Sequence, residues 1–164
     1  MKKLLTIAIM AVSAIATFGA EPIAAEENIL SNRWGLYGKA ETRGTQSFSK
    51  GIFTIENKAG QHGGFYQSFL MKKPATTITI FGESRAENVV GNPNANYCLY
   101  ADIRFVEGKP MFGKRISFKT GTHDWEKAEL VIPTQRKIKS MSFYILFRNM
   151  TGKVQFRNIK VTAK

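Results

Sequence analysis

The chain has 164 residues, a formal net charge of +12 from 24 Lys and Arg against 12 Asp and Glu, and a single cysteine, Cys98. One cysteine excludes an internal disulfide framework, so the fold must be held by its hydrophobic core, in which we expect Cys98 to lie. The positive charge favours a polyanionic partner such as an acidic polysaccharide, with a solvated basic surface that aids solubility as the alternative.

The N-terminus has the pattern of a secretory signal peptide. Lys2 and Lys3 precede an apolar run over 4–16, which is too short for a stable membrane-spanning helix of roughly 20 residues. We expect residues 1–20 to be removed, with cleavage between 16 and 25, and the protein to be secreted or periplasmic. The rest of the chain has no second long apolar segment, so we expect no membrane insertion, and export disfavours a nucleic-acid partner.

From residue 28 onward the sequence predicts one all-β domain, over 28–164. Turn residues recur at short intervals between segments rich in Phe, Tyr, Ile, Val and Thr, which is typical of a two-sheet antiparallel β-sandwich. Strands are predicted over 51–57, 65–70, 76–84, 96–106, 115–119, 125–132, 139–149 and 153–162. Eight or nine strands are what a jelly roll needs.

Period-two alternation assigns the side chains of each strand to a face. In 76–84, Ile78 and Ile80 point one way and Phe81 the other. In 96–106 and 139–149, the residues around Leu99 and Phe143 form apolar faces and polar residues lie opposite. The last strand can bury its apolar residues only if a β-bulge at 157–158 shifts its register.

The outward residues of three strands suit carbohydrate recognition, because aromatic faces stack on sugar rings and planar charged groups bind hydroxyls in pairs. If those strands are neighbours in one sheet, they line a binding cleft. The candidate residues are Phe81, Glu83, Arg85, Tyr100, Asp102, Arg104, Tyr144 and Arg148. The alternative is a solvated face of cross-strand ion pairs. Trp34 and Tyr37 could form a rim platform, although we expect Trp34 to plug the sandwich end.

The sequence does not predict an enzyme. His62 and His123, the only histidines, lack metal-ligand spacing, and Cys98 has no histidine near it in sequence, so we predict no metal site and no cysteine nucleophile. Glu83 and Asp102 are the candidates for a glycosidase carboxylate pair. Arginines two residues further along each strand favour ionised, ion-paired carboxylates instead.

Several stretches, taken in order and spacing, resemble a known family. They are 64–67 (GFYQ), 80–87 (IFGESRAE), 100–105 (YADIRF), 118–125 (FKTGTHDW) and 152–161 (GKVQFRNIKV). Over roughly residues 28–162 the chain is similar to carbohydrate-binding modules with a galactose-binding-like jelly-roll fold, the accessory domains of bacterial polysaccharide-degrading enzymes. The resemblance implies a jelly roll, carbohydrate binding and a structural role for Trp125.

One departure from the family concerns a structural calcium. The family often carries two acidic residues after the aromatic of the last strand, where they help to hold the ion. Here those positions are Arg157 and Asn158, and an arginine brings a positive charge where calcium needs oxygen ligands. We therefore expect no cofactor, with Asn158 and nearby carbonyls as the remaining ligands if the calcium is kept.

These observations predict a secreted, non-catalytic module that recognises a poly- or oligosaccharide on the concave face of a jelly roll. The basic charge favours an acidic glycan. The alternatives are a structural or protein-interaction jelly roll without sugar binding and, more remotely, a small polysaccharide lyase.

Overall fold

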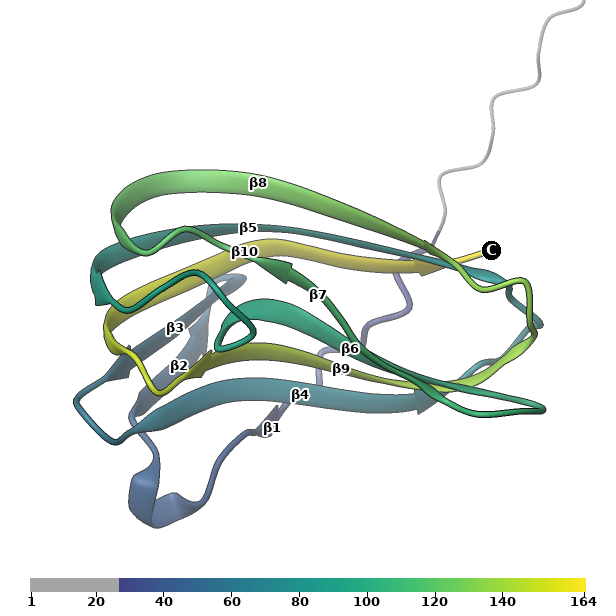
Figure 1. Ribbon diagram of the computed structural model, residues 1–164, viewed down its shortest axis with the longest axis horizontal. Helices are drawn as coiled ribbons and strands as arrows, with labels where there is room; N and C mark the ends of the chain where they lie inside the picture. Colours follow the sequence, from purple (N-terminus) through teal and green to yellow (C-terminus); the bar gives the residue numbers. More distant parts are fainter. Residues whose placement is uncertain (1–26) are drawn as a thin grey trace, which may run out of the picture.

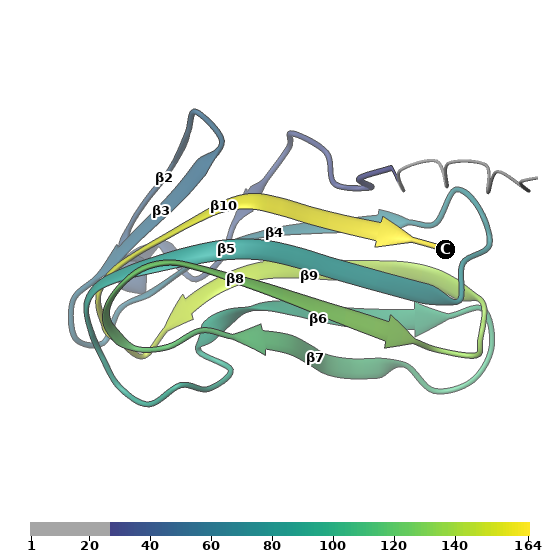
Figure 2. The same ribbon diagram turned by 90° about the horizontal axis from the view of Figure 1, so that it is seen from above.

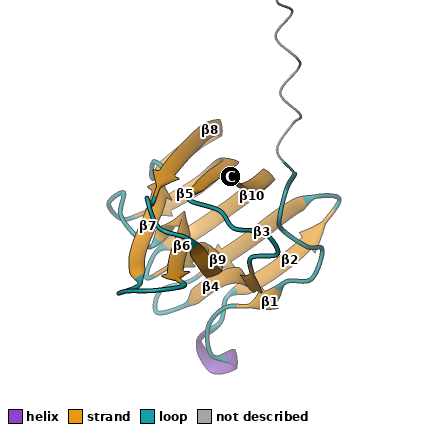
Figure 3. Ribbon diagram, turned by 90° about the vertical axis from the view of Figure 1, so that its right-hand side faces the viewer, coloured by secondary structure: helices purple, strands orange, loops and turns teal. Residues whose placement is uncertain are grey.

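The fold is a two-layer β-sandwich, as the sequence predicts. The computed structural model describes residues 27–164, so the predicted signal peptide and its cleavage window lie outside the described residues. Two five-stranded antiparallel sheets pack face to face, and Figure 3 shows them as two layers. Alternation of buried and less buried side chains along strands such as β4 and β6 gives each sheet one side to pack against the other.

Sheet A has the strand order β1-β4-β9-β6-β7. Its strands are β1 (Gly35–Leu36), β4 (His62–Leu70), β9 (Ile138–Arg148), β6 (Tyr97–Phe105) and β7 (Met111–Ser117). Figure 1 shows β4, β9 and β6 side by side, with the short strand β1 at one edge.

Sheet B has the strand order β2-β3-β10-β5-β8. Its strands are β2 (Thr45–Ser49), β3 (Ile52–Asn57), β10 (Thr151–Ala163), β5 (Thr77–Val90) and β8 (Gly121–Pro133). In Figure 2 the β2–β3 hairpin leans away from the long strands β10, β5 and β8. From β3 to β10 the chain changes sheet at every step except β6 to β7, so strands that follow one another in sequence mostly lie in opposite layers.

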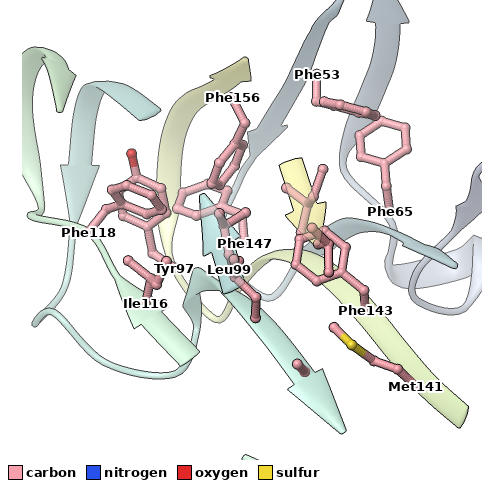
Figure 4. Close-up of a cluster of buried hydrophobic side chains, with 14 of the residues drawn as sticks. Phe53, Phe65, Tyr97, Leu99, Ile116, Phe118, Met141, Phe143, Phe147 and Phe156 are labelled. Atoms are coloured by element: carbon pink, nitrogen blue, oxygen red, sulfur yellow. The ribbon is translucent and has the colours of Figure 1, made fainter. Parts of the chain in front are cut away.

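The core lies between the two sheets and is rich in aromatic rings (Figure 4). Phe53 of sheet B packs edge-on against Phe65 of sheet A with ring centroids 5.0 Å apart. Phe156 of sheet B meets Tyr97 of sheet A at 5.7 Å. The residues that alternation assigns to the core are buried, which confirms the face assignment. They include Ile78, Ile80, Leu99, Ala101, Ile103, Phe143, Ile145 and Phe147.

Strand β10 contains the bulge that the sequence predicts. Its register with β5 shifts between Arg157 and Lys160, and Asn158 has a φ of 52°, in the left-handed region. The extra residue returns the alternation to the correct phase. Phe156 before the bulge and Val161 after it are both fully buried.

Three short elements are absent from the predicted set: β1, β2 and a 3-10 helix over Ala40–Thr42. Trp34, just before β1, plugs the sandwich as expected, with its ring 4.8 Å from Phe53. Cys98 is fully buried, as predicted. No helix among residues 27–164 is long and apolar enough to cross a bilayer.

Candidate functional site

Three tyrosines form a row across the outer face of sheet A. Tyr66 on β4 lies opposite Tyr144 on β9, which lies opposite Tyr100 on β6. Residues in register on neighbouring strands point to the same side, so the rings are adjacent. The centroids of Tyr66 and Tyr144 are 6.1 Å apart in a stacked arrangement, and those of Tyr100 and Tyr144 are 5.7 Å apart at 72°. We call these residues the tyrosine row.

A fourth tyrosine, Tyr37, lies directly after β1 and packs beside the tyrosine row. The backbone N–H of Tyr37 donates to the Gly64 carbonyl at 2.8 Å, and its ring lies 6.1 Å from Tyr144. Arg148 holds it from the other side, because Nη1 donates to the Tyr37 hydroxyl at 3.1 Å and Nη2 donates to the Ala95 carbonyl at 3.0 Å. The tyrosine row and Tyr37 together make the tyrosine face, on which Arg148 positions Tyr37.

Polar groups line the next row of the same face. The hydroxyls of Ser68 and Ser142 are 2.9 Å apart, and Asp102 lies opposite Ser142 on β6. The Gly113 N–H donates to Asp102 Oδ1 at 3.1 Å and fixes the carboxylate. Partial burial, followed by the neighbouring Asp102 carboxylate, raises the pKa of Tyr100, so its phenol keeps its proton as a donor. Hydroxyls and a fixed carboxylate can bind sugar hydroxyls beside the stacked rings.

The tyrosine face continues into a pocket of about 350 Å³ at the β1 edge of sheet A. Tyr66 and Ser68 form its inner wall, and Ser31 and Arg33 approach from the N-terminal segment. Gly35 allows this arrangement, because a Cβ there would meet the Tyr66 ring at 2.4 Å. The missing side chain leaves room for the Tyr66 ring beside the edge strand β1.

Five of the eight predicted site residues lie on the outer side of sheet A. Tyr100, Asp102 and Tyr144 meet on the tyrosine face, and Arg104 is exposed two residues further along β6. Arg148 is also there, but two of its three guanidinium nitrogens bind the protein and Nε is buried without a partner. Its role is therefore to position its neighbours.

The other three predicted residues, Phe81, Glu83 and Arg85, lie on β5 in sheet B. The condition that all three strands are neighbours in one sheet is not met, because the chain crosses to the other layer between β5 and β6. Their side chains do alternate outward as predicted, but from the opposite outer face. The structure does not bring them to the tyrosine face.

On the outer face of sheet B, Glu83 and Arg85 belong to a cluster around Trp125. Glu83 is 4% exposed; its Oε2 accepts a hydrogen bond from Arg157 Nε at 2.8 Å and its Oε1 accepts one from Asn158 at 3.1 Å. The Arg157 hydrogen bond is the main cause that lowers the pKa of Glu83. The guanidinium groups of Arg157 and Arg85 lie 4.0 and 5.0 Å from the Trp125 ring centroid.

The residues at this bulge do not fit the structural calcium that the resemblance implies. Both Glu83 oxygens accept hydrogen bonds from Arg157 and Asn158, and Arg157 supplies the positive charge that an ion would bring. Calcium takes six to eight oxygen ligands. Within residues 27–164, no three His, Cys, Asp or Glu side chains converge on one point.

Sequence reasoning missed Tyr66 and left Tyr37 undecided. Alternation in β4 could have found Tyr66, since Phe65 beside it is buried and the next residue must point outward. The neighbouring Gln67 is a weaker candidate from the sequence. It is buried instead, and its side chain binds the backbone of Ser31 through Oε1 at 3.0 Å and Nε2 at 2.6 Å.

Comparison with solved structures decides the fold. A structure described as "CBM4 structure and function" superposes with a TM-score of 0.56 at 13% identity, covering 80% of this chain and 86% of that one. The second N-terminal cellulose-binding domain of Cellulomonas fimi β-1,4-glucanase C gives 0.54 at 11% identity, covering 85% and 96%. The chain has the fold of carbohydrate-binding modules.

Two further proteins are similar to this chain over only a small part of their own length. The enzymatically active domain of bacteriophage CBA120 tailspike protein 4 superposes with a TM-score of 0.54 at 12% identity, over 81% of this chain and 20% of that one. The tRNA nuclease WapA of Bacillus subtilis (strain 168) is 31% identical over 85 residues, which are 51% of this chain. The chain spans only 4% of that curated relative's length. No family model matches the sequence.

Proposed function

We propose that this chain is a non-catalytic carbohydrate-binding module that holds an oligo- or polysaccharide on the tyrosine face. The observation that carries the proposal is the tyrosine row, three rings in register on one open side of a sheet. Aromatic faces stack on the C–H side of sugar rings. The adjacent row of Ser68, Ser142 and Asp102 offers the polar groups that sugar hydroxyls need.

The geometry of the ionisable groups supports a binding role without catalysis. A tyrosine that removes a proton near neutral pH needs a lowered pKa, whereas that of Tyr100 is raised by partial burial and by Asp102. This direction disfavours Tyr100 as the base of a lyase. Glu83 and Asp102 lie on different sheets and point to opposite outer faces, so they cannot flank one glycosidic bond as a glycosidase pair does.

The proposed place of action is outside the cytoplasm, in the periplasm or the medium. Lys2 and Lys3 followed by the apolar run over 4–16 support export. Polysaccharides accessible to a binding module are found in those compartments, which agrees with the proposed ligand.

Affinity electrophoresis tests the proposal. The purified protein would run through native gels containing single neutral or acidic polysaccharides, and hits would be titrated by calorimetry in 1 M salt, where the Debye length is about 3 Å. Tyr66→Ala, which removes a ring that is 41% exposed, should weaken binding roughly 30-fold, as expected for a residue worth about 2 kcal/mol. The matched control is Phe48→Ala, which removes a ring that is 45% exposed on sheet B.

The two variants separate the competing functions. Binding that persists in 1 M salt, that Tyr66→Ala weakens about 30-fold and that Phe48→Ala leaves unchanged supports a sugar site on the tyrosine face. Retardation that both variants retain places binding elsewhere. A folded protein that no polysaccharide retards contradicts the proposal and favours the structural-domain alternative.

A further inference from the structure

Charge is divided unequally between the two sheets. The strands of sheet A carry one acidic residue, Asp102, against five basic residues, which are Arg104, Lys114, Arg115, Lys139 and Arg148. The strands of sheet B carry six acidic residues against five basic ones. The excess positive charge of the strands therefore lies in sheet A, which carries the tyrosine face.

Arginines flank the tyrosine row at both of its ends. On β7, Arg115 lies directly opposite Tyr100, so it extends the row by one strand. At the other end, Arg33 lines the pocket beside Tyr66. The row from β7 to β1 crosses five strands, a distance of about 19 Å at roughly 4.8 Å per strand spacing. This is long enough for several consecutive sugar units.

These arginines are available to a ligand. Arg33, Arg104 and Arg115 are exposed. Among residues 27–164 the ion pairs are Lys119–Glu126, Lys153–Glu87 and Arg157–Glu83, and none lies on the tyrosine face. The only carboxylate on that sheet is already held by the Gly113 N–H. Within the described part of the chain no carboxylate pairs with the positive charge of Arg148 either, because the partners of its guanidinium are the Tyr37 hydroxyl and the Ala95 carbonyl.

We infer that the ligand of the tyrosine face is an anionic polysaccharide, whose carboxylate or sulfate groups bind Arg33 and Arg115 while its rings stack on the tyrosines between them. This inference rests on the proposed function and specifies its ligand class. Guanidinium groups bind carboxylate and sulfate oxygens through two parallel hydrogen bonds. A neutral glycan would leave the charges at both ends of the row without partners.

The test compares polymers that differ only in charge. Polygalacturonate is paired with fully methyl-esterified pectin, and dextran sulfate with dextran. Poly-uridylate serves as a polyanion of another class, a nucleic acid whose charge lies on phosphates and whose bases can stack on tyrosines. The protein variants are Arg33→Gln/Arg115→Gln and Tyr66→Ala. The control is Lys127→Gln/Lys160→Gln, which removes the same charge from sheet B.

We expect one charged polymer to bind at least tenfold more tightly than its neutral partner, with the carboxylated or sulfated pair identifying the group. The double arginine variant should lose about 100-fold, roughly tenfold for each charged contact, while the double lysine variant stays within about twofold.

Four results would overturn the inference in distinguishable ways. Equal binding of charged and neutral polymers that still depends on Tyr66 would remove the charge requirement and leave the proposed function intact. Binding that ignores Tyr66→Ala would contradict the proposed function as well. Equal losses in the arginine and lysine variants would show diffuse charge attraction. Poly-uridylate bound as tightly through the same residues would assign the face to nucleic acid.

Discussion

Replacing Gly35 by alanine should damage the tyrosine face without unfolding the protein. A Cβ on Gly35 would lie 2.4 Å from Cε1 and 2.6 Å from Cζ of Tyr66, whereas carbon atoms in favourable contact are about 3.5–4.0 Å apart. The ring must therefore move by about 1 Å or more. Because Tyr66 is 41% exposed, it can swing toward solvent and leave no cavity.

The expected magnitudes differ for stability and for binding. Alanine restricts the unfolded chain more than glycine does, so the free energy of unfolding should change by no more than about 1 kcal/mol, in either direction. The displaced ring no longer extends the tyrosine row, so polysaccharide affinity should fall toward that of Tyr66→Ala, by roughly 30-fold or about 2 kcal/mol.

A double-mutant cycle makes this reasoning refutable. Calorimetric titration would give the affinities of Gly35→Ala, Tyr66→Ala and the double variant, and thermal unfolding would report their stability. If Gly35 acts only through Tyr66, it should have no further effect in the Tyr66→Ala background. Additive losses in the double variant, or wild-type affinity in Gly35→Ala beside a weakened Tyr66→Ala, would show that ring placement is not what matters.

Four other substitutions or treatments probe the framework. Tyr97→Phe removes a buried 2.6 Å hydrogen bond to Ser84 and should lower unfolding free energy by about 1 kcal/mol and Tm by about 3 °C, read by calorimetry. Burial raises the pKa of Cys98 to about 12, so a thiol reagent at pH 8 should react only as fast as the protein unfolds. Since Arg157 lowers the pKa of Glu83 below its ordinary 4.5, the stability from this pair is full above pH 4.5. This stability is lost as the pH falls through the lowered pKa of Glu83, so the difference in Tm between the wild-type protein and Glu83→Gln should shrink there. Separately, because the bulge does not fit a calcium ion, a chelator should leave the Tm of the wild-type protein unchanged at pH 7.

The strands of the core were predictable because burial imposes a strong pattern on them. Leu99, Ala101 and Ile103 alternate with polar residues, and a half-buried strand is the only element with that period. Even the bulge at Asn158 followed from the need to bury Phe156 and Val161 on one side. Strands β1 and β2 could not be predicted, because they are short edge strands with few buried residues and so lack the pattern.

The site was only partly predictable, because alternation assigns a residue to an inner or outer face but not to a sheet. Glu83 and Asp102 both point outward by the same rule, yet β5 and β6 lie in different layers. In a jelly roll, neighbours in a sheet come from distant parts of the chain. Tyr66 and Tyr144 are 78 positions apart and lie directly opposite each other. That pairing depends on the whole topology rather than on any local signal.

Arg148 shows why residue type alone does not identify a contact. An outward arginine beside Tyr144 suits a sugar, and the sequence offers no sign that its donors are already used. In the structure they hold Tyr37 and the Ala95 carbonyl, which joins the N-terminal segment and the loop before β6 to the end of β9. Arg33, in the N-terminal segment, and Arg115, on the edge strand β7, have no such partners among the described residues, and neither does Arg104 near the end of β6. Whether an outward arginine can bind a ligand is thus decided by the groups that the fold brings beside it: Arg148 is engaged by Tyr37 and Ala95 and organises the tyrosine face, whereas Arg33 and Arg115 are left to bind.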